Sequence, residues 1–446
     1  MNKIVASVGL VALGASGLQP VFAQQAQASP DTTKPWSIAA TLRGFYDDNI
    51  NSSPNRQSAF GYQASPSGIV SLSTDQTTFN AGATYSATYY DHTPFNSSDR
   101  WDNAFTLNGG LTHNFNEEYQ ASVTESFVLG QEPDMLRAGN TFSEFNRVSG
   151  DNIRNSGAIT VDGKLTRLLG FEVGYDNAYY DYAAISAPTD IAGPGQIRTG
   201  PGATLNRIEN GVHLEGRYEL APETYGIVGF RYREIGYTAG VPITGTSVVG
   251  APDTFSVLVN SDARNADMYA PYVGISHVFS PSLNASLDVG ANYAEYPNDS
   301  SQAANWSPYV SLSGQYHYTP QSYIEVGFTQ DRSPSSVTGF NPNGANSGFA
   351  NLTVDQETST LFASINHQIT SRLVASAMAQ YQAGVFNGGS FDNNSQTYYL
   401  VGVNLDYTIT QNLSAHIGYN YDKLDSSVGS QSFDRNRVYM GVTASY

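Results

Sequence analysis

The sequence contains no cysteine, few charged residues and no long apolar segment. Without cysteine it has no disulfide scaffold, no thiolate metal site and no cysteine nucleophile. Charged residues make up 13% of the 446 positions, with 21 basic against 39 acidic side chains and a net charge of −18. Because nucleic-acid phosphates require a basic surface, we expect no nucleic-acid partner. No stretch reaches the roughly 18 apolar residues of a transmembrane helix.

The N-terminus has the pattern of a secretory signal peptide. A basic residue, Lys3, is followed by an apolar stretch to about Leu18, and residues 21–23 fit a cleavage site. We predict a signal peptide at 1–23 and a short periplasmic segment at 24–35.

The remaining sequence favours β-strands. The whole sequence is rich in Tyr, which occurs 30 times, and in Gly, which occurs 42 times. Long segments alternate between apolar and polar residues, as in Leu283, Ala285, Leu287 and Val289 interleaved with Asn284, Ser286 and Asp288. In a strand such alternation places one set on each side of the sheet. The polar set is mostly uncharged, and lengths of about 10–14 residues span a bilayer when tilted.

Short polar turns recur between the alternating segments. Their chemistry is typical of tight hairpins. They lie at 113–119, 218–224, 277–283, 317–323, 367–373 and 407–413, with less regular members at 75–76 and 166–168. We therefore predict an all-β fold: one transmembrane antiparallel β-barrel of about 18 strands (16–18) over residues 36–446. It has short periplasmic turns and long extracellular loops, and we place its second strand near 66–74 after a loop at 48–65.

The chain ends in an alternating strand that closes on Tyr446. This ending resembles the C-terminal signal of bacterial outer-membrane proteins. The resemblance implies recognition by the barrel-assembly machinery and a location in the outer membrane of a Gram-negative bacterium. The surrounding partners are then outer-membrane lipid and lipopolysaccharide. Porins of 16 to 18 strands are often trimers, so a homotrimer is one assembly that we consider.

Most charged residues in the predicted strands occupy the polar positions of the alternating pattern. We predict these as pore-lining residues: Arg43, Arg207, Glu209, Glu215, Arg217, Glu219, Arg231, Asp288, Glu325 and Asp406. Charges of both signs are densest at 205–233. One hypothesis is that this wall sets the transverse field of a constriction; the alternative is a salt-bridge ladder that only stiffens the barrel. Glu125 is an exception on the apolar set, which implies a β-bulge or a wrong register there.

Enzyme signatures are missing from the sequence. There is no HExxH, GxSxG or P-loop motif. The acidic stretches at 47–49 and 392–394 could bind Ca²⁺ or Mg²⁺, but neither matches a dedicated calcium loop. We therefore predict no enzyme, no cofactor and no metal site.

The opening strand and the residues after it, Trp36 to Ile50, include the run Gly44-Phe45-Tyr46-Asp47-Asp48-Asn49. This segment resembles the start of the Putative β-barrel porin 2 family of outer-membrane proteins, some associated with exopolysaccharide export. The resemblance implies a porin-like or polysaccharide-related role and identifies no functional residues.

Three functions remain open at this point. The first is a passive porin for small hydrophilic solutes or ions. The second is an outer-membrane component of exopolysaccharide export. The third is a structural or adhesive barrel whose lumen is plugged by a loop, for which 131–152 and 238–265 are the candidates.

Overall fold

The computed structural model describes residues 34–93, 99–130, 152–182, 191–193, 196–197, 201–248, 251–300, 302–335, 337, 352–428 and 431–446. The predicted signal peptide at 1–23 lies outside these ranges, as do residues 24–33. None of the helices in the described ranges has the length and apolar character to cross a membrane.

Eighteen strands form one sheet. They are β1 (Trp36–Asp47), β2 (Ala59–Ser73), β3 (Thr77–Tyr90), β4 (Trp101–Asn114), β5 (Tyr119–Leu129), β6 (Asn152–Lys164), β7 (Leu169–Tyr182), β10 (Arg207–Ala221), β11 (Thr224–Tyr237), β14 (Ala266–Ser280), β15 (Leu283–Glu295), β16 (Asn305–Thr319), β17 (Ser322–Pro334), β18 (Asp355–Thr370), β19 (Leu373–Asn387), β20 (Ser395–Thr410), β21 (Leu413–Ser426) and β22 (Phe433–Ser445).

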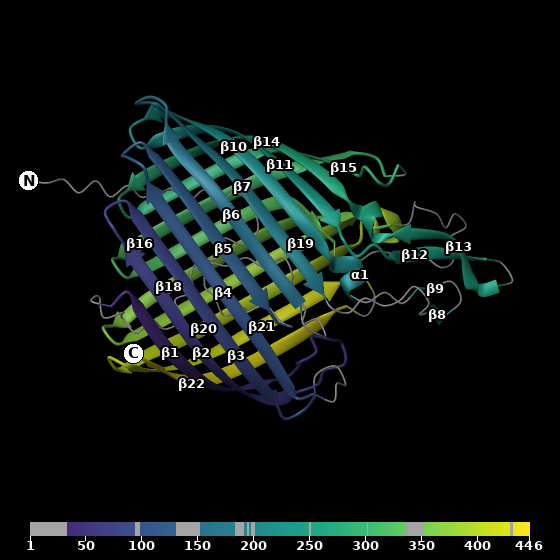
Figure 1. Cartoon of the computed structure of the whole chain (residues 1–446), viewed down its shortest axis with the longest axis horizontal. Coiled ribbons are helices and arrows are strands. Elements are labelled where there is room, and N and C mark those ends of the chain that lie inside the picture. The colour runs from purple at the N-terminus through teal and green to yellow at the C-terminus, as the bar shows by residue number, and fades with distance from the viewer. Residues whose placement is uncertain are drawn as a thin grey trace, which may run out of the picture.

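Each strand pairs antiparallel with the next, and the ring closes between β1 and β22. The closing register runs from Ala39 opposite Ser445 to Asp47 opposite Arg437. Strand β1 begins and strand β22 ends at the same end of the barrel (Figure 1). The eight short connections follow strands β2, β4, β6, β10, β14, β16, β18 and β20, as the sequence predicted. The predicted fold class, a closed antiparallel barrel of about 18 strands, is confirmed.

The second strand begins earlier than predicted. It starts at Ala59, whereas we placed its start near residue 66. Pro66 interrupts the pairing with β3, which runs from Gly61 to Ala64 and resumes at Ser67. Proline has no N–H to donate, so it breaks the ladder on that side. On the other side Pro66 still lies opposite Ala40 of β1, and the strand continues.

The long connections contain small elements of their own. Helix α1 (Pro201–Leu205) precedes β10, and the strand pair β8 (Ile191–Gly193) and β9 (Gln196–Ile197) precedes α1. Strands β12 (Pro242–Val248) and β13 (Ala251–Asn260) form a hairpin, followed by the 3₁₀ turn η2 (Ser261–Arg264). A second such turn, η4 (Gly389–Phe391), follows β19.

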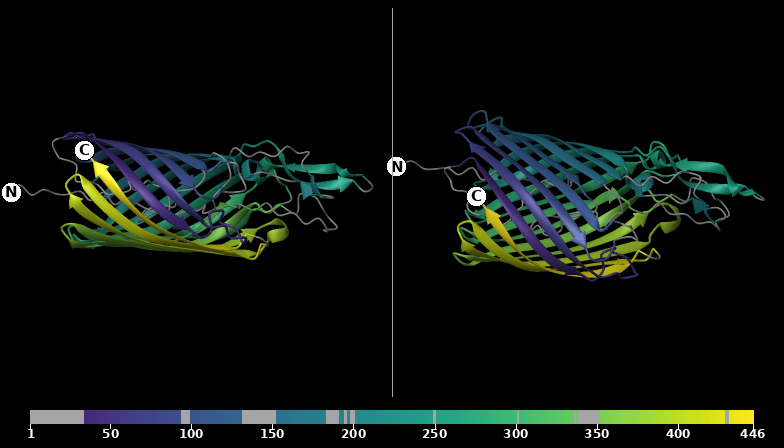
Figure 2. Two further views of the ribbon diagram at one scale, coloured as in Figure 1. Left: turned by 90° about the horizontal axis from the view of Figure 1, so that it is seen from below. Right: turned by 60° about the horizontal axis from the view of Figure 1, so that its bottom comes forward.

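The β12–β13 hairpin projects away from the barrel rim (Figures 1 and 2). The prediction that the loop at 238–265 plugs the lumen is therefore wrong, because the hairpin within this loop extends outward. Almost all of the other candidate plug, 131–152, lies outside the described residues.

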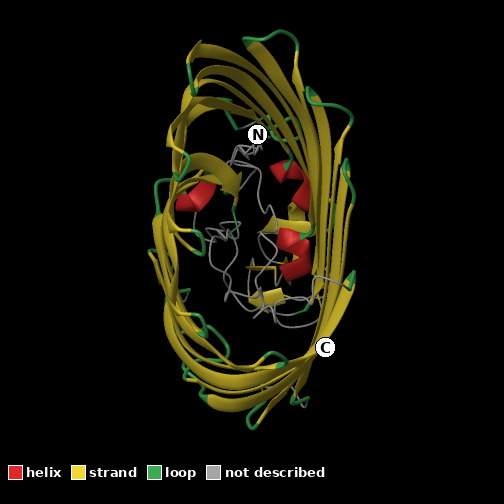
Figure 3. Cartoon of the chain, turned by 90° about the vertical axis from the view of Figure 1, so that its left-hand side faces the viewer, coloured by secondary structure: helices red, strands yellow, loops and turns green. Residues whose placement is uncertain are grey.

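The alternation of side chains gives the barrel two different surfaces. Large apolar side chains on one set point outward, and Leu42, Val228 and Met440 are 60%, 68% and 65% exposed. The other set is polar and mostly buried or half-buried, as with Glu215 and Asp288. An apolar outside with a polar inside is the pattern of a barrel that crosses a membrane. Viewed along its axis, the barrel has an elongated oval cross-section (Figure 3).

Candidate functional site: the inner wall of the barrel

Large inner side chains lie flat against glycines of neighbouring strands. A Cβ on Gly174 would be 2.0 Å from the ring of His213, and one on Gly229 would be 2.1 Å from the ring of Tyr272. Only glycine leaves room for such contacts. The same arrangement places Asp176 on Gly211, Asp288 on Gly274, Phe362 on Gly327, Tyr439 on Gly418 and Phe45 on Gly61. These side chains consequently lie along the wall rather than standing upright on it.

All ten predicted pore-lining residues lie on the inner set of their strands. On β10, for example, Glu215 alternates with Leu214, which is exposed on the outer face, and Arg217 alternates with Tyr218. The strand registers extend this assignment to the other strands. The ten inner residues are Arg43, Arg207, Glu209, Glu215, Arg217, Glu219, Arg231, Asp288, Glu325 and Asp406. Whether they line a conducting pore stays a prediction.

Arg217 holds the main charge cluster of the inner wall. Its guanidinium donates from Nε to Glu215 at 2.5 Å and from Nη1 to Asp162 at 3.2 Å, and it also binds Glu172. His213 lies 3.1 Å from the other carboxylate oxygen of Glu172 through Nε2. One arginine on β10 therefore joins carboxylates from β6, β7 and β10.

Two further residues extend this cluster across the wall. Tyr272 of β14 donates its hydroxyl to Glu215 at 3.1 Å. Asp288 of β15 is 7% exposed, and its Oδ1 atom has no hydrogen-bond partner among the described residues. We call Asp162, Glu172, His213, Glu215, Arg217, Tyr272 and Asp288 together the charged wall.

The other arginines at 205–233 bind different partners. Arg207 donates Nε to Glu209 at 2.8 Å and lies over the ring of Tyr180. Arg231 donates to Asp331 of β17 at 2.7 Å. The structure therefore brings Glu215 and Arg217 together but gives Arg207 and Arg231 separate ion pairs, so the predicted continuous wall at 205–233 divides into three groups.

The remaining predicted residues are more isolated. Arg43 donates to Gln63 at 3.3 Å and lies 4.9 Å from the ring centre of Tyr439. Asp406 accepts a hydrogen bond from Asn404. Glu219 and Glu325 are both half-buried.

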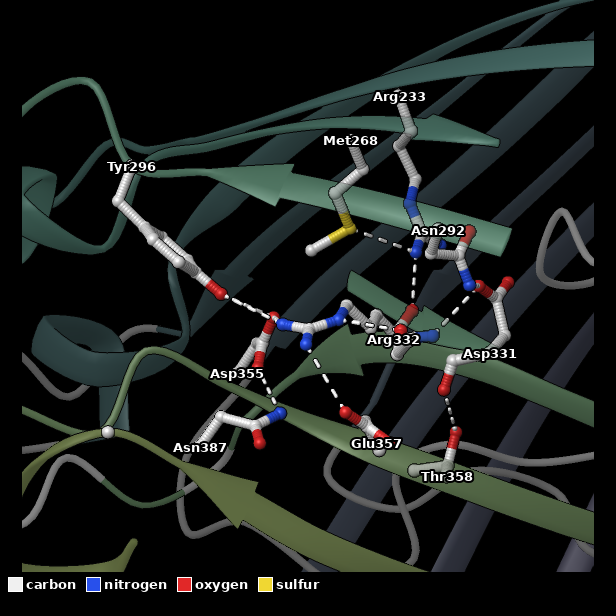
Figure 4. A network of polar contacts seen from close by, with 12 residues as sticks. Arg233, Met268, Asn292, Tyr296, Asp331, Arg332, Asp355, Glu357, Thr358 and Asn387 are labelled. Atoms are coloured by element: carbon white, nitrogen blue, oxygen red, sulfur yellow. Dashed lines mark hydrogen bonds and ion pairs between the residues drawn. The ribbon is translucent and has the colours of Figure 1, made fainter. Parts of the chain in front are cut away.

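A network of ionic contacts joins strands at the loop end of the barrel (Figure 4). Arg332 is fully buried; it donates to Asp355 at 2.9 Å, to Glu357 at 3.2 Å and to the Tyr296 hydroxyl at 3.2 Å. Tyr296 in turn donates to Asp355 at 2.6 Å. We call this group, with Asp331, Arg231 and Asn292, the rim network. Sequence reasoning missed Asp331, Arg332 and Asp355 because they stand at strand ends next to long loops.

An apolar cluster lies beside the rim network. It consists of Ala203, Ile235, Tyr237, Ile243, Val259, Ala263, Ala266, Met268, Ala294, Tyr296, Leu352 and Val354. The wall strands β11, β14 and β15 contribute some members, and the loop elements α1 and η2 contribute others. Arg264 of η2 is 1% exposed and donates to the carbonyl oxygen of Thr204 at 2.8 Å. The loops are thus packed against the strand ends on this part of the rim.

The acidic stretch at 47–49 is engaged by arginines rather than left open for a metal. Asp47 accepts from Arg435 at 3.0 Å and from Arg437 at 3.1 Å. Asp48 accepts from the side chain of Asn436 at 2.8 Å. Within the described ranges no group of three acidic or histidine side chains has an arrangement that could hold a metal ion.

Glu125 lies on the outer surface without a bulge. Its strand pairs in regular register, with Gly109 on one side and Gly157 on the other. The side chain is exposed like its neighbour Val123. Both explanations that we offered, a β-bulge and a wrong register, are therefore wrong. The glycine at 157 gives the carboxylate room, because a Cβ there would be 2.4 Å from Oε2.

Three comparisons relate the chain to known proteins. The model of the family described as Putative beta-barrel porin 2 matches residues 356–446, from β18 to the C-terminus. This is the family that the opening strand resembles, so the resemblance is confirmed. The comparison with curated proteins gave no match.

Several solved outer-membrane proteins are similar to this chain at low sequence identity. OccAB4 of Acinetobacter baumannii has a TM-score of 0.41 at 12% identity, covering 92% of this chain and 98% of that one. The outer membrane protein OpdK of Pseudomonas aeruginosa has 0.39 at 10%, covering 92% and 99%. The alcaligin receptor FauA of Bordetella pertussis has 0.44 at 14%, covering 92% and 76%. Similarities at this level carry no information on solutes or partners.

The apolar outer face, the closed ring and the family match together identify an outer-membrane protein. Because the strands pair completely around the ring, no open sheet edge meets lipid. The barrel is therefore porin-like in architecture.

Proposed function

We propose that this outer-membrane barrel, whose last five strands match the Putative beta-barrel porin 2 family, is a passive channel for small hydrophilic solutes and ions. One observation carries the proposal. The inner set is polar, and several of its large side chains lie against glycines of neighbouring strands. A ring of 18 strands is wide enough for an aqueous lumen, whereas eight strands fill with side chains. We propose no enzymatic role.

Within this channel the charged wall sets the ion preference. Arg217 offsets part of the charge of Asp162, Glu172 and Glu215, and Asp288 adds a further carboxylate. Rings or walls of carboxylates favour cations in a pore. We therefore expect a weakly cation-selective channel.

Conductance recording tests the proposal directly. The refolded protein, inserted in a planar bilayer, should give stepwise conductance that rises with KCl concentration. Under a KCl gradient the reversal potential should report a preference for K⁺ over Cl⁻. In proteoliposomes, neutral sugars should enter at rates that fall with size. Heat-modifiable migration on a gel shows whether the barrel is folded. If folded protein forms no channel, the proposal is contradicted.

A second candidate is a structural or adhesive barrel with a closed mouth. The observation that favours it is the packed rim, where α1, η2 and Leu352 join the apolar cluster. In that case the wild-type protein does not conduct, and disrupting the rim network by Arg332→Met creates conductance. A porin conducts before that change.

For a polysaccharide-export role the inner aromatics offer little support. Tyr309 and Tyr398 are each 2% exposed, and Tyr309 lies under the guanidinium of Arg231. Their ring faces are covered rather than presented to a sugar. Neutral polymer added to the recordings tests this role, because a transported polymer should block the current.

A further inference from the structure

The charged wall contains more negative charge than its own residues neutralise. Its carboxylates are Asp162, Glu172, Glu215 and Asp288, and its basic side chains are one guanidinium, Arg217, and one imidazole, His213. The group stays negative whichever charge His213 carries. A buried carboxylate is costly unless a cation or a hydrogen-bond donor compensates it.

The deficit is concentrated at Asp288. This residue lies between Leu287 and Val289, which are exposed on the outer face, so its own side chain points inward. The carboxylate rests on Gly274 of β14, where a Cβ would be 2.0 Å from Oδ1. Oδ1 is buried, and no residue in the described part of the chain forms a hydrogen bond with it. Within the charged wall, Glu215 repels the Asp288 carboxylate and Arg217 attracts it.

Arg217 does not supply the missing donor. Its three nitrogens are used by Glu215, Asp162 and Glu172. In the registers Arg217 lies opposite Ile227, Ile227 opposite Gly274, and Gly274 opposite Asp288. Two strands therefore separate Arg217 from Asp288. The hydroxyl of Tyr272 is likewise committed, since it donates to Glu215.

We propose that Asp288 forms a binding site for a small organic cation that carries N–H donors, an alkylammonium or a guanidinium group. Such a ligand brings both the positive charge and the donor that Asp288 lacks. An Asp carboxylate turns readily about its last torsion, so either oxygen can face the ligand. A bare metal ion fits less well, because the described side chains include no set of three with metal-binding geometry.

This inference rests on the proposed channel, since the ligand reaches the wall through the lumen. It narrows the solute class from small hydrophilic molecules to cationic ones with N–H groups. Such solutes then bind at this site as they pass through the lumen, and an occupied site reduces the current carried by K⁺.

Block of the K⁺ current by guanidinium tests the site. We expect guanidinium to reduce single-channel K⁺ conductance, and tetramethylammonium, which has the same charge but no N–H, to do so far less. In Asp288→Asn the half-blocking concentration of guanidinium should rise about tenfold, as expected for losing one hydrogen bond to a charged group. Asp75→Asn, the same change in the exposed turn after β2, should leave the block unchanged.

Three results would overturn the site: equal block of wild type and Asp288→Asn, equal block by the two cations, or an equal effect of Asp75→Asn. If the folded protein forms no channel, the porin proposal fails on its own. Titration calorimetry of guanidinium into the detergent-solubilised barrel then decides the site separately. Heat released by wild type but not by Asp288→Asn supports it, and no difference between the two overturns it.

Discussion

The inner surface of the barrel has two parts with different chemistry. The charged wall, on β6 to β15, carries ion pairs centred on Arg217. On β18 to β21 several inner positions carry amides, and we call these residues the amide wall: Gln356, Gln380, Gln382, Asn404 and Asn420. There a typical contact is the hydrogen bond from Gln396 to Gln356 at 2.7 Å.

Both walls share the same backbone arrangement. Strands pair in regular antiparallel register on either side, and large inner side chains rest on glycines in both: Tyr272 on Gly229 in one, Phe362 on Gly327 near the other. The fold therefore tolerates either kind of inner surface, because strand hydrogen bonds and the apolar outer face hold the ring. Ion preference is expected to follow the inner residues alone.

The largest loss of stability should come from disrupting the rim network. Arg332→Met removes the fully buried guanidinium that holds Asp355 and Glu357. Breaking a buried ion pair by removing one partner costs roughly 3–5 kcal/mol, and we expect about 4 kcal/mol. Urea unfolding in lipid vesicles, followed by tryptophan fluorescence, measures the change. A loss below about 1 kcal/mol would contradict a structural role for the rim network.

Within the charged wall, Arg217→Met should have the next largest effect. It leaves Glu172 and Glu215 buried without their cation, and we expect a loss of about 3 kcal/mol. The reversal potential under a KCl gradient should also shift toward stronger K⁺ preference. Arg43→Met is the matched control. Arg43 contacts Gln63 through a long hydrogen bond and lies over the ring of Tyr439, so its replacement should cost less than the replacement of Arg217, about 1 kcal/mol. Equal losses in the two variants would remove the distinction between clustered and isolated arginines.

Alternation in the sequence predicted which residues face inward, and this is why all ten candidates lie on the inner set. It could not predict which inner residues meet. Arg231 and Asp331 are a hundred positions apart in the sequence. Three strands lie between β11, which carries Arg231, and β17, which carries Asp331, so their ion pair depends on the curvature of the wall. A partial signal existed for Asp162, which shares its set with Lys164 two positions later. For Arg332 the strand predicted from the sequence ended one residue too early to include it, because β17 continues to Pro334.

On the amide wall, a substitution should affect stability but not ion preference. Gln356→Met leaves Gln396 without its acceptor, and an unsatisfied buried amide costs roughly 1–3 kcal/mol. We expect a loss of about 1.5 kcal/mol with an unchanged reversal potential. A shift of that potential as large as the one caused by Arg217→Met would show that the amide wall also contributes to the ion preference.

The smallest effect is expected on the lipid side, at Glu125. If this exposed carboxylate meets hydrocarbon, Glu125→Leu should stabilise the barrel by about 1 kcal/mol, less than the roughly 2–4 kcal/mol known for basic residues at the bilayer midplane. Val123→Leu, on the same face of β5, is the control and should change little. A stabilising result means that lipid covers Glu125 and its flanking glycines, Gly109 and Gly157. Destabilisation by Glu125→Leu alone would mean that another polypeptide contacts this face and uses the carboxylate. Unfolding at several protein-to-lipid ratios would then show whether that polypeptide is a second copy of the chain, because the stability of a homo-oligomer rises with protein concentration.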